Sequence, residues 1–160
     1  MPSPVAAIVE RYFAGAEVPL AAIEGLSAAE LTARPIPGTW SIAEIVVHLA
    51  DSDLTGSDRM KRVIAMERPL LLAFDESSFA ARLAYNEQDV RAAAELFRLN
   101  RRLTTAILQR LPTEAFARQG VHTEVGLVSL SELVEKFSQH LDGHMIHLRH
   151  KRTLLGQPLS

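Results

Sequence analysis

The chain contains four long stretches in which apolar residues recur every three to four positions, as they do along one face of an α-helix. Their boundaries fall at about residues 4–26, 42–66, 87–111 and 130–155. Between them we find no convincing run of alternating apolar and polar residues, so no strand is expected. The pattern predicts an all-α fold, an antiparallel four-helix bundle.

The ends of two of these helices are marked by their own residues. Ser41 with Glu44, and Ser129 with Glu132, form the serine-x-x-glutamate capping box that opens a helix. Gly156 follows the last apolar position of the fourth stretch and is typical of a helix end. The second and fourth helices are therefore expected to begin at residues 42 and 130.

The segments between the helices are long. Pro19 predicts a kink or break inside the first stretch, and residues 34–38 form a loop with two prolines and a glycine. Residues 67–86 look irregular, with a brief helix expected at 77–83, and residues 112–128 are expected to form a loop. A minimal bundle uses connections of about two to eight residues. We therefore expect a single domain over 1–160 with long connecting loops.

Composition narrows the classes of function. The 160 residues include 17 Lys and Arg against 19 Asp and Glu, a net charge of −2, so no nucleic-acid or membrane partner is expected. No signal peptide and no apolar span of about 18 residues is visible. Cysteine is absent, which excludes thiolate ligands and a cysteine nucleophile and fits a reducing compartment. We expect a cytoplasmic protein that acts on a small molecule.

Histidine is the unusual feature of this composition. Four of the six histidines lie in the last predicted helix. At about 100° per residue, His144 falls inside the apolar stripe, while His140 and His147 line its edge and His150 turns away. A His-x-x-x-His pair places two imidazoles one turn apart on the same face, where both can bind one metal ion.

A third ligand has to come from another helix, because two imidazoles alone bind a metal ion weakly. His48 is the only histidine of the second helix, and it lies at the border of the apolar stripe. We therefore predict a metal site formed by His48, His140 and His144, with His147 as an alternative ligand. Neutral imidazole suits zinc, nickel, copper or iron.

Two carboxylates flank His48 on the predicted helix, Glu44 and Asp51. Either is a candidate general base, or a group that orients a ring N–H of a ligand. Other interpretations stay open at this point. Histidines on an apolar face are often ordinary core residues, and the chain can also be a non-catalytic metal-binding or dimerisation module.

Two strings in the sequence resemble the DinB-like superfamily. The first is Pro35-Ile36-Pro37-Gly38-Thr39-Trp40-Ser41-Ile42-Ala43-Glu44, followed by His48-Leu49-Ala50-Asp51. The second runs from Gly126-Leu127-Val128-Ser129-Leu130 to His140-Leu141-Asp142-Gly143-His144. The middle of the chain is similar in layout, so the resemblance covers most of it. This superfamily includes damage-inducible metalloproteins, thiol-dependent S-transferases and the metal-binding domain of mycothiol-dependent maleylpyruvate isomerases.

The resemblance implies a four-helix bundle that holds a divalent metal ion, with zinc and nickel expected, on His48, His140 and His144. It also implies an open coordination position and a homodimer. The implied reaction uses an external low-molecular-weight thiol, whose metal-activated thiolate attacks an electrophile. The alternative is a hydrolase that uses metal-bound hydroxide.

Overall fold

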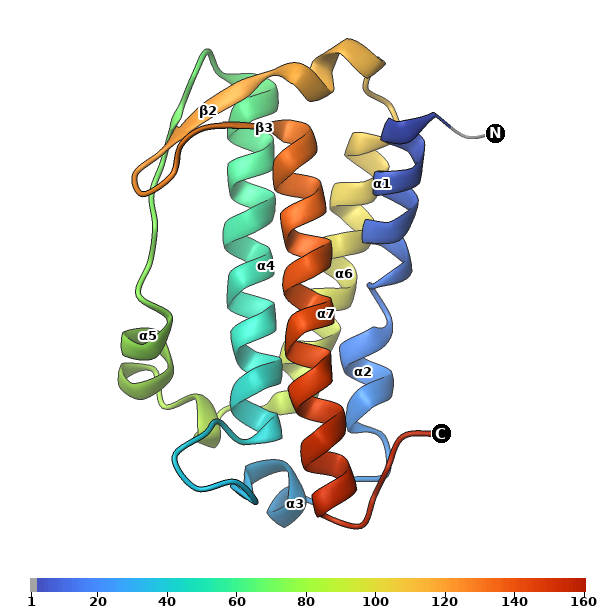
Figure 1. Ribbon diagram of the computed structural model, residues 1–160, viewed down its shortest axis with the longest axis vertical. Helices are drawn as coiled ribbons and strands as arrows, with labels where there is room; N and C mark the ends of the chain where they lie inside the picture. Colours follow the sequence, from blue (N-terminus) through green and yellow to red (C-terminus); the bar gives the residue numbers. More distant parts are fainter. Residues whose placement is uncertain (1–2) are drawn as a thin grey trace.

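The computed structural model describes residues 3–160, and four long rods in this range pack side by side (Figure 1). The first rod consists of two consecutive helices. The elements of the bundle are α1 (Pro4–Ala14) continued by α2 (Val18–Ile23), α4 (Ile42–Ala65), α6 (Val90–Leu108) and α7 (Leu130–Leu154). The predicted four-helix bundle is confirmed.

The order of the helices around the bundle follows from their contacts. Both α4 and α1 pack against α6 and against α7, so α1 and α4 are diagonal. The hydroxyl of Ser41, before α4, donates to Asn86 before α6. Arg118, after α6, donates to the carbonyl of Val63 near the end of α4. Hence α4 and α6 run in the same direction, and α7 runs against α4 (Figure 1).

This parallel pair exists because the segment 66–89 crosses the length of the bundle before α6 begins (Figure 1). The segment carries α5 (Glu76–Arg82), which matches the brief helix expected there, and a short 3-10 helix, η1 (Tyr85–Glu87). Asp89 caps α6, which therefore begins at Val90, three residues later than predicted. The long crossover places α5 beside the middle of the bundle.

Both predicted capping boxes are present. The backbone N–H of Glu44 donates to the Ser41 hydroxyl, and the Glu44 carboxylate accepts from the backbone N–H of Ser41. Ser129 and Glu132 make the same reciprocal pair at the start of α7. An unpredicted third box opens the short helix α3 (Ala28–Thr32). These caps fix where the helices that bear the histidines begin.

The first rod breaks at another place than predicted. The interruption lies at residues 15–17, and Pro19 lies in the first turn of α2, where its missing N–H costs nothing. Gly15 lies in this interruption, and a Cβ there would lie 2.5 Å from Nη1 of Arg101 and 2.7 Å from Cδ2 of Leu141. Close packing of the end of α1 against α6 and α7 therefore requires glycine.

The expectation of no strands was wrong for three short segments. They are β1 (Leu70–Leu71), β2 (Gln119–His122) and β3 (Gly126–Ser129), in the order β1-β2-β3. β1 pairs parallel to β2, and β2 and β3 form a hairpin. Gly126, at φ +78°, makes the left-handed turn that closes a three-residue hairpin loop. Strands of two to four residues are too short for alternation to show in the sequence.

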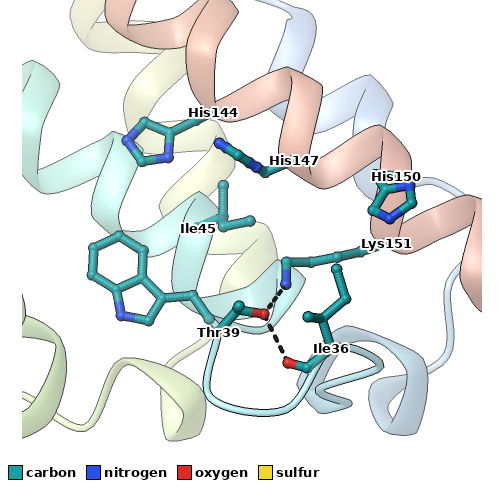
Figure 2. A pocket seen from close by; sticks show the side chains of 8 residues that line it. Ile36, Thr39, Ile45, His144, His147, His150 and Lys151 are labelled. Atoms are coloured by element: carbon teal, nitrogen blue, oxygen red, sulfur yellow. Dashed lines mark hydrogen bonds between the residues drawn. The ribbon is translucent and has the colours of Figure 1, made fainter.

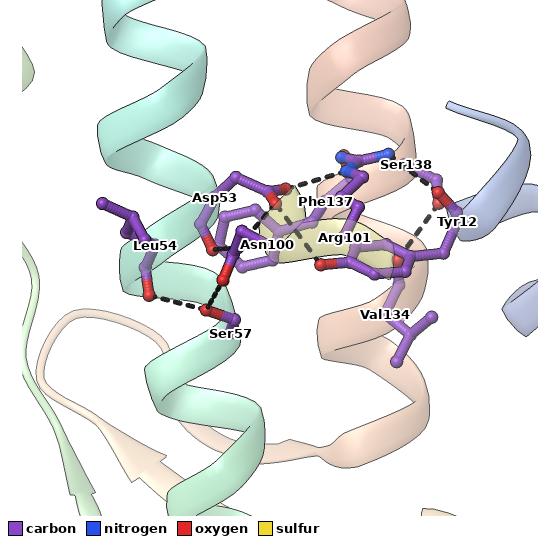
Figure 3. Close-up of polar contacts among 9 residues, drawn as sticks. All are labelled: Tyr12, Asp53, Leu54, Ser57, Asn100, Arg101, Val134, Phe137 and Ser138. Carbon is purple, nitrogen blue, oxygen red and sulfur yellow. Dashed lines mark hydrogen bonds and ion pairs between the residues drawn. The ribbon is translucent and has the colours of Figure 1, made fainter. Parts of the chain in front are cut away.

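A polar layer divides the core of the bundle. One apolar cluster packs around Ile42, Leu49 and Leu148, and the other around Met60 and Leu133. Between the two clusters lies the polar layer, formed by the side chains of Tyr12, Asp53, Asn100 and Arg101, with Ser57 beside them (Figure 3).

None of the helices in residues 3–160 is long and apolar enough to span a membrane.

Arg101 is the centre of the polar layer, with only 1% of its surface exposed. Its Nε donates to Oδ1 of Asp53 at 2.9 Å, Nη1 to the carbonyl of Tyr12 at 3.2 Å, and Nη2 to the carbonyl of Phe137 at 2.8 Å. Asn100 also donates to the Asp53 carboxylate, at 2.9 Å. One guanidinium of α6 thus joins α1, α4 and α7 (Figure 3).

Candidate metal centre

Three of the predicted ligands meet between α4 and α7. Nε2 of His140 lies 3.1 Å from Nε2 of His48 and 3.1 Å from Nε2 of His144. One ring nitrogen from each imidazole lies within 4.8 Å of the others. In a tetrahedral site with nitrogen about 2.0–2.1 Å from zinc, two ligand nitrogens are roughly 3.3 Å apart. The spacing of these nitrogens fits a shared metal ion.

The chemistry of the three rings leads to the same conclusion. Nε2 of a neutral imidazole carries either one proton or one lone pair, so that of His140 cannot satisfy two imidazole partners at once. A cation, by contrast, accepts a lone pair from all three rings. Buried polar atoms in proteins are nearly always paired. The histidine cluster, His48 with His140 and His144, therefore has the donor set of a metal site.

Burial keeps these imidazoles neutral. His48 is fully buried, and desolvation together with the neighbouring imidazoles lowers its pKa to about 3. Desolvation, followed by the charge of His144, lowers the pKa of His140 to about 4. The pKa of His144 is lowered as well, mainly by burial. At neutral pH all three rings are in the unprotonated form that binds metals.

Neither carboxylate that the sequence suggested as a base contacts the cluster. Both carboxylate oxygens of Glu44 accept from Arg34, at 2.7 and 3.2 Å. Asp51 accepts from the hydroxyl of Tyr85. Within residues 3–160, neither lies within ion-pair distance of the three imidazoles. These contacts hold the flanking loops against α4, and a role in proton transfer stays a prediction.

The carboxylate that does face the cluster is that of Glu76, which the sequence analysis did not select. Its Oε2 lies 3.8 Å from Nε2 of His48, and its Oε1 lies 4.0 Å from Nε2 of His140. Glu76 is the first residue of α5 and is about half exposed. Burial raises its pKa, and Lys136 opposes that shift. The only signal in the sequence was an acidic start to the brief helix at 75–76.

The remaining histidines lie outside this group. His147, the predicted alternative ligand, lines a cavity beside His144 (Figure 2). His150 also lies along that cavity. His122, for which no site was expected, is buried in β2, where its Nδ1 accepts from the N–H of Glu124 at 3.2 Å. The described residues thus bring together three histidines, as proposed, without His147.

Two cavities adjoin the cluster, and they share no lining residue. The apolar cavity, of about 240 Å³, is lined by Ile36, Thr39, Trp40, Ile45, His144, His147, His150 and Lys151 (Figure 2). The ring centroid of Trp40 lies 4.9 Å from that of His48, and the ring stacks on that of His144 at a centroid distance of 6.2 Å. The polar cavity, of about 100 Å³, reaches His140 and Glu76. The cluster therefore has space on two sides.

Comparison with known proteins identifies the family to which the chain belongs. The family model of the DinB superfamily matches residues 16–148, so the chain belongs to the DinB superfamily. The predicted resemblance is confirmed.

The individual relatives share less than a third of their residues with this chain. The chain is 28% identical over 127 residues to a protein of Oceanobacillus iheyensis named "Putative metal-dependent hydrolase OB0413", covering 79% of this chain and 73% of that one. The fold of the present chain resembles that of YfiT from Bacillus subtilis, which is described as a probable metal-dependent hydrolase with an unusual four-helix bundle topology. The superposition of this chain on YfiT has a TM-score of 0.88 at 20% identity and covers 98% of this chain and 91% of YfiT.

The fold also resembles the mycothiol-dependent maleylpyruvate isomerase, with a TM-score of 0.72 at 14% identity, covering 91% of this chain and 61% of the isomerase. At these identities both structural likenesses establish the fold alone. The activity of this chain has to be argued from its own residues.

Proposed function

We propose that this protein is a metal-dependent S-transferase that joins an external thiol to a small electrophile. The observation that supports this proposal is the position of the histidine cluster between two separate cavities, in a chain without cysteine. A nucleophile from outside and an electrophile each need a place beside the metal. Two cavities that each include one imidazole of the cluster provide those places.

In this proposal His48, His140 and His144 hold a divalent ion, zinc or nickel. Bound to three neutral ligands, such an ion keeps its charge, lowers the pKa of bound water to about 7 and ionises a bound thiol. The carboxylate of Glu76 takes the thiol proton, because it is the carboxylate nearest to the open side of the cluster. The sulfur then forms a bond to the electrophilic carbon, and the leaving group departs with the electron pair.

The apolar cavity suits the less polar of the two reactants. Trp40 and Ile45 supply apolar surface beside His144, and Lys151 is held by the hydroxyl of Thr39 (Figure 2). Aromatic and aliphatic walls with a few polar groups are typical of small-molecule sites. An aryl or alkyl electrophile fits this side of the cluster.

The test is consumption of chlorodinitrobenzene or monobromobimane in the presence of a small thiol. Zinc- and nickel-loaded protein should accelerate the reaction, and protein stripped with a chelator should not. The Arg149→Ala variant is the matched control, because it removes an exposed side chain of α7 that lines neither cavity. Equal acceleration by stripped protein would contradict the proposal.

Hydrolysis is the second candidate, and Glu76 favours it. A half-exposed carboxylate about 4 Å from two ligand nitrogens is placed to take a proton from water as readily as from a thiol. The names of OB0413 and YfiT point in the same direction for those proteins. Metal-dependent turnover of an activated ester without thiol, and no thiol transfer, would select this candidate.

The homodimer implied by the family also stays a prediction. The most exposed apolar side chains of α6 are Leu96, Leu99 and Leu103, with 44%, 48% and 68% of their surfaces accessible. Sedimentation velocity of the purified chain checks the expectation, and a monomer over the full concentration range would contradict it.

A third outcome is that the protein binds metal stoichiometrically but catalyses neither thiol transfer nor hydrolysis. The remaining interpretation is then a non-catalytic metal-binding module.

A further inference from the structure

Arg59 is a buried cation that makes no ion pair within the part of the chain that the structure describes, although the charges of Glu124 and Asp58 act on it from a distance. It lies on α4 with 6% of its surface exposed. One of its Nη atoms donates to the carbonyl of Leu72, and its buried Nε has no hydrogen-bond partner. Within residues 3–160, no carboxylate lies within ion-pair distance of it. Buried charges are normally paired, because burying an unpaired charge is costly.

The contrast with Arg101 shows what is missing. Arg101 is buried as well, yet its three nitrogens donate to a carboxylate and two carbonyls. Both arginines lie in the same bundle, so burial alone does not explain the unpaired state of Arg59. Arg59 also lines the polar cavity, the space that reaches His140. An anionic group inside that cavity would supply the partner.

Two further donors line the same cavity. Lys136, on α7, is exposed and makes no ion pair among the described residues. His122 accepts a backbone hydrogen bond at Nδ1, so its neutral ring carries the proton on Nε2 and can donate from there. Guanidinium, ammonium and imidazole N–H from three different elements thus surround one small space.

We propose that the polar cavity binds the carboxylate or phosphate group of one of the two substrates and so directs its reacting end toward the histidine cluster. This inference rests on the proposed function, because it treats the cavity as part of that site. Arginine recognises both groups through parallel N–H donors.

Each end of the cavity carries a carboxylate. Glu76 lies beside the histidine cluster, and Glu124 lies close enough to Arg59 for its charge to favour the protonated guanidinium, opposing the lowering of the Arg59 pKa by burial. Glu124 is exposed, so solvent screens its charge, whereas the guanidinium of Arg59 is buried. The anionic group is therefore held by Arg59, and the rest of the substrate extends toward His140. The two cations balance the two carboxylates, and a bound divalent ion adds the positive charge that favours an anionic substrate.

The experiment measures binding to zinc-loaded protein by titration calorimetry, with inorganic phosphate, acetate and neutral acetamide as separate probes. We expect phosphate or acetate to bind and acetamide not to bind. Binding of phosphate identifies the substrate group as a phosphate, and binding of acetate identifies it as a carboxylate. Arg59→Met should weaken anion binding about tenfold and Lys136→Met about threefold, as expected for losing a buried and an exposed charged donor. Lys61→Met, an exposed lysine on α4, is the control and should leave the affinity unchanged.

Zinc content is measured on every preparation, so a failure of the metal site is seen separately from a failure of the anion site. The inference is overturned if neither anion binds, or if acetamide binds as well as they do. It is also overturned if Lys136→Met and a folded Arg59→Met both retain wild-type affinity. Should Arg59→Met not fold, unchanged binding by Lys136→Met overturns it alone, because that side chain is exposed.

Discussion

Two polar clusters lie in the interior of this bundle, and they differ in whether their polar atoms are paired. In the layer around Arg101, each nitrogen of the guanidinium has an acceptor, and Asp53 accepts from both Arg101 and Asn100. In the histidine cluster, the Nε2 atoms of three rings face one another. The first cluster has its polar atoms paired within the protein, and the second has the spacing of a site that could hold a metal ion.

The comparison separates stability from function. A fully bonded polar layer needs no ligand to explain it, whereas three imidazole nitrogens that face one another are the arrangement a metal site would need. The two clusters are also connected, because Arg101 donates to the carbonyl of Phe137, three residues before His140. The layer around Arg101 thereby fixes the stretch of α7 that presents the histidine cluster.

The largest effect is expected from removing a ligand. His48→Ala or His144→Ala should abolish stoichiometric metal binding, because two imidazoles hold a divalent ion weakly. Elemental analysis measures the metal, and circular dichroism should show unchanged helix content. His150→Ala should retain the metal. Full metal content in both ligand variants would reject the proposed set.

Removing the centre of the polar layer tests the other half of the comparison. Arg101→Met leaves the buried Asp53 carboxylate without its cation and should lower the free energy of unfolding by about 3–5 kcal/mol. Arg98→Met, which breaks ion pairs with partly exposed Glu95 and Glu17, should cost no more than about 1 kcal/mol. Urea denaturation compares the two. Equal losses would show that the layer has no special role.

The role of Glu76 is tested with the metal in place. Glu76→Gln should keep the metal and slow turnover about 100-fold, since a positioned base contributes about that much or more. Asp51→Asn is the rival variant, and a larger effect from it would transfer the role to the residue suggested by sequence. Two measurements are needed for each variant: the initial rate at saturating thiol, and the amount of bound metal. A slow variant that keeps its metal has lost a base, whereas a slow variant without metal has lost a ligand.

A smaller effect concerns pH and the metal-free protein. Because the pKa of His48 is about 3 in the folded state and near 6.5 when unfolded, the unfolded chain binds more protons between these values. Stability should therefore fall as the pH drops from about 6.5 toward 4. Thermal denaturation in chelator measures it, with His48→Leu as the control that should flatten the dependence. If stability depends on pH with the same slope in the wild type and in His48→Leu, the lowered pKa is not that of His48.

Helical periodicity was enough to predict that these three histidines meet, and not what surrounds them. His140 and His144 share a face because they are four residues apart on one helix, and His48 lies at a border that faces it. Glu76 reaches the cluster through tertiary structure, because the crossover between α4 and α6 carries α5 to the bundle's middle. No periodicity within one segment encodes that position. The strand β1 was missed for a related reason, since its only pairing among the described residues is with β2, which is distant in the sequence. The hairpin of β2 and β3 was missed because its strands have only four residues each.

The separation of the ligands along the chain has a consequence for biosynthesis. His48 and His140 are 92 residues apart, and one belongs to the second rod while the other belongs to the last. A nascent chain on the ribosome therefore has no complete cluster until α7 has emerged and docked. A metal ion held by all three histidines would therefore bind only after folding, so a metal ion added early in translation should not speed the collapse of the bundle.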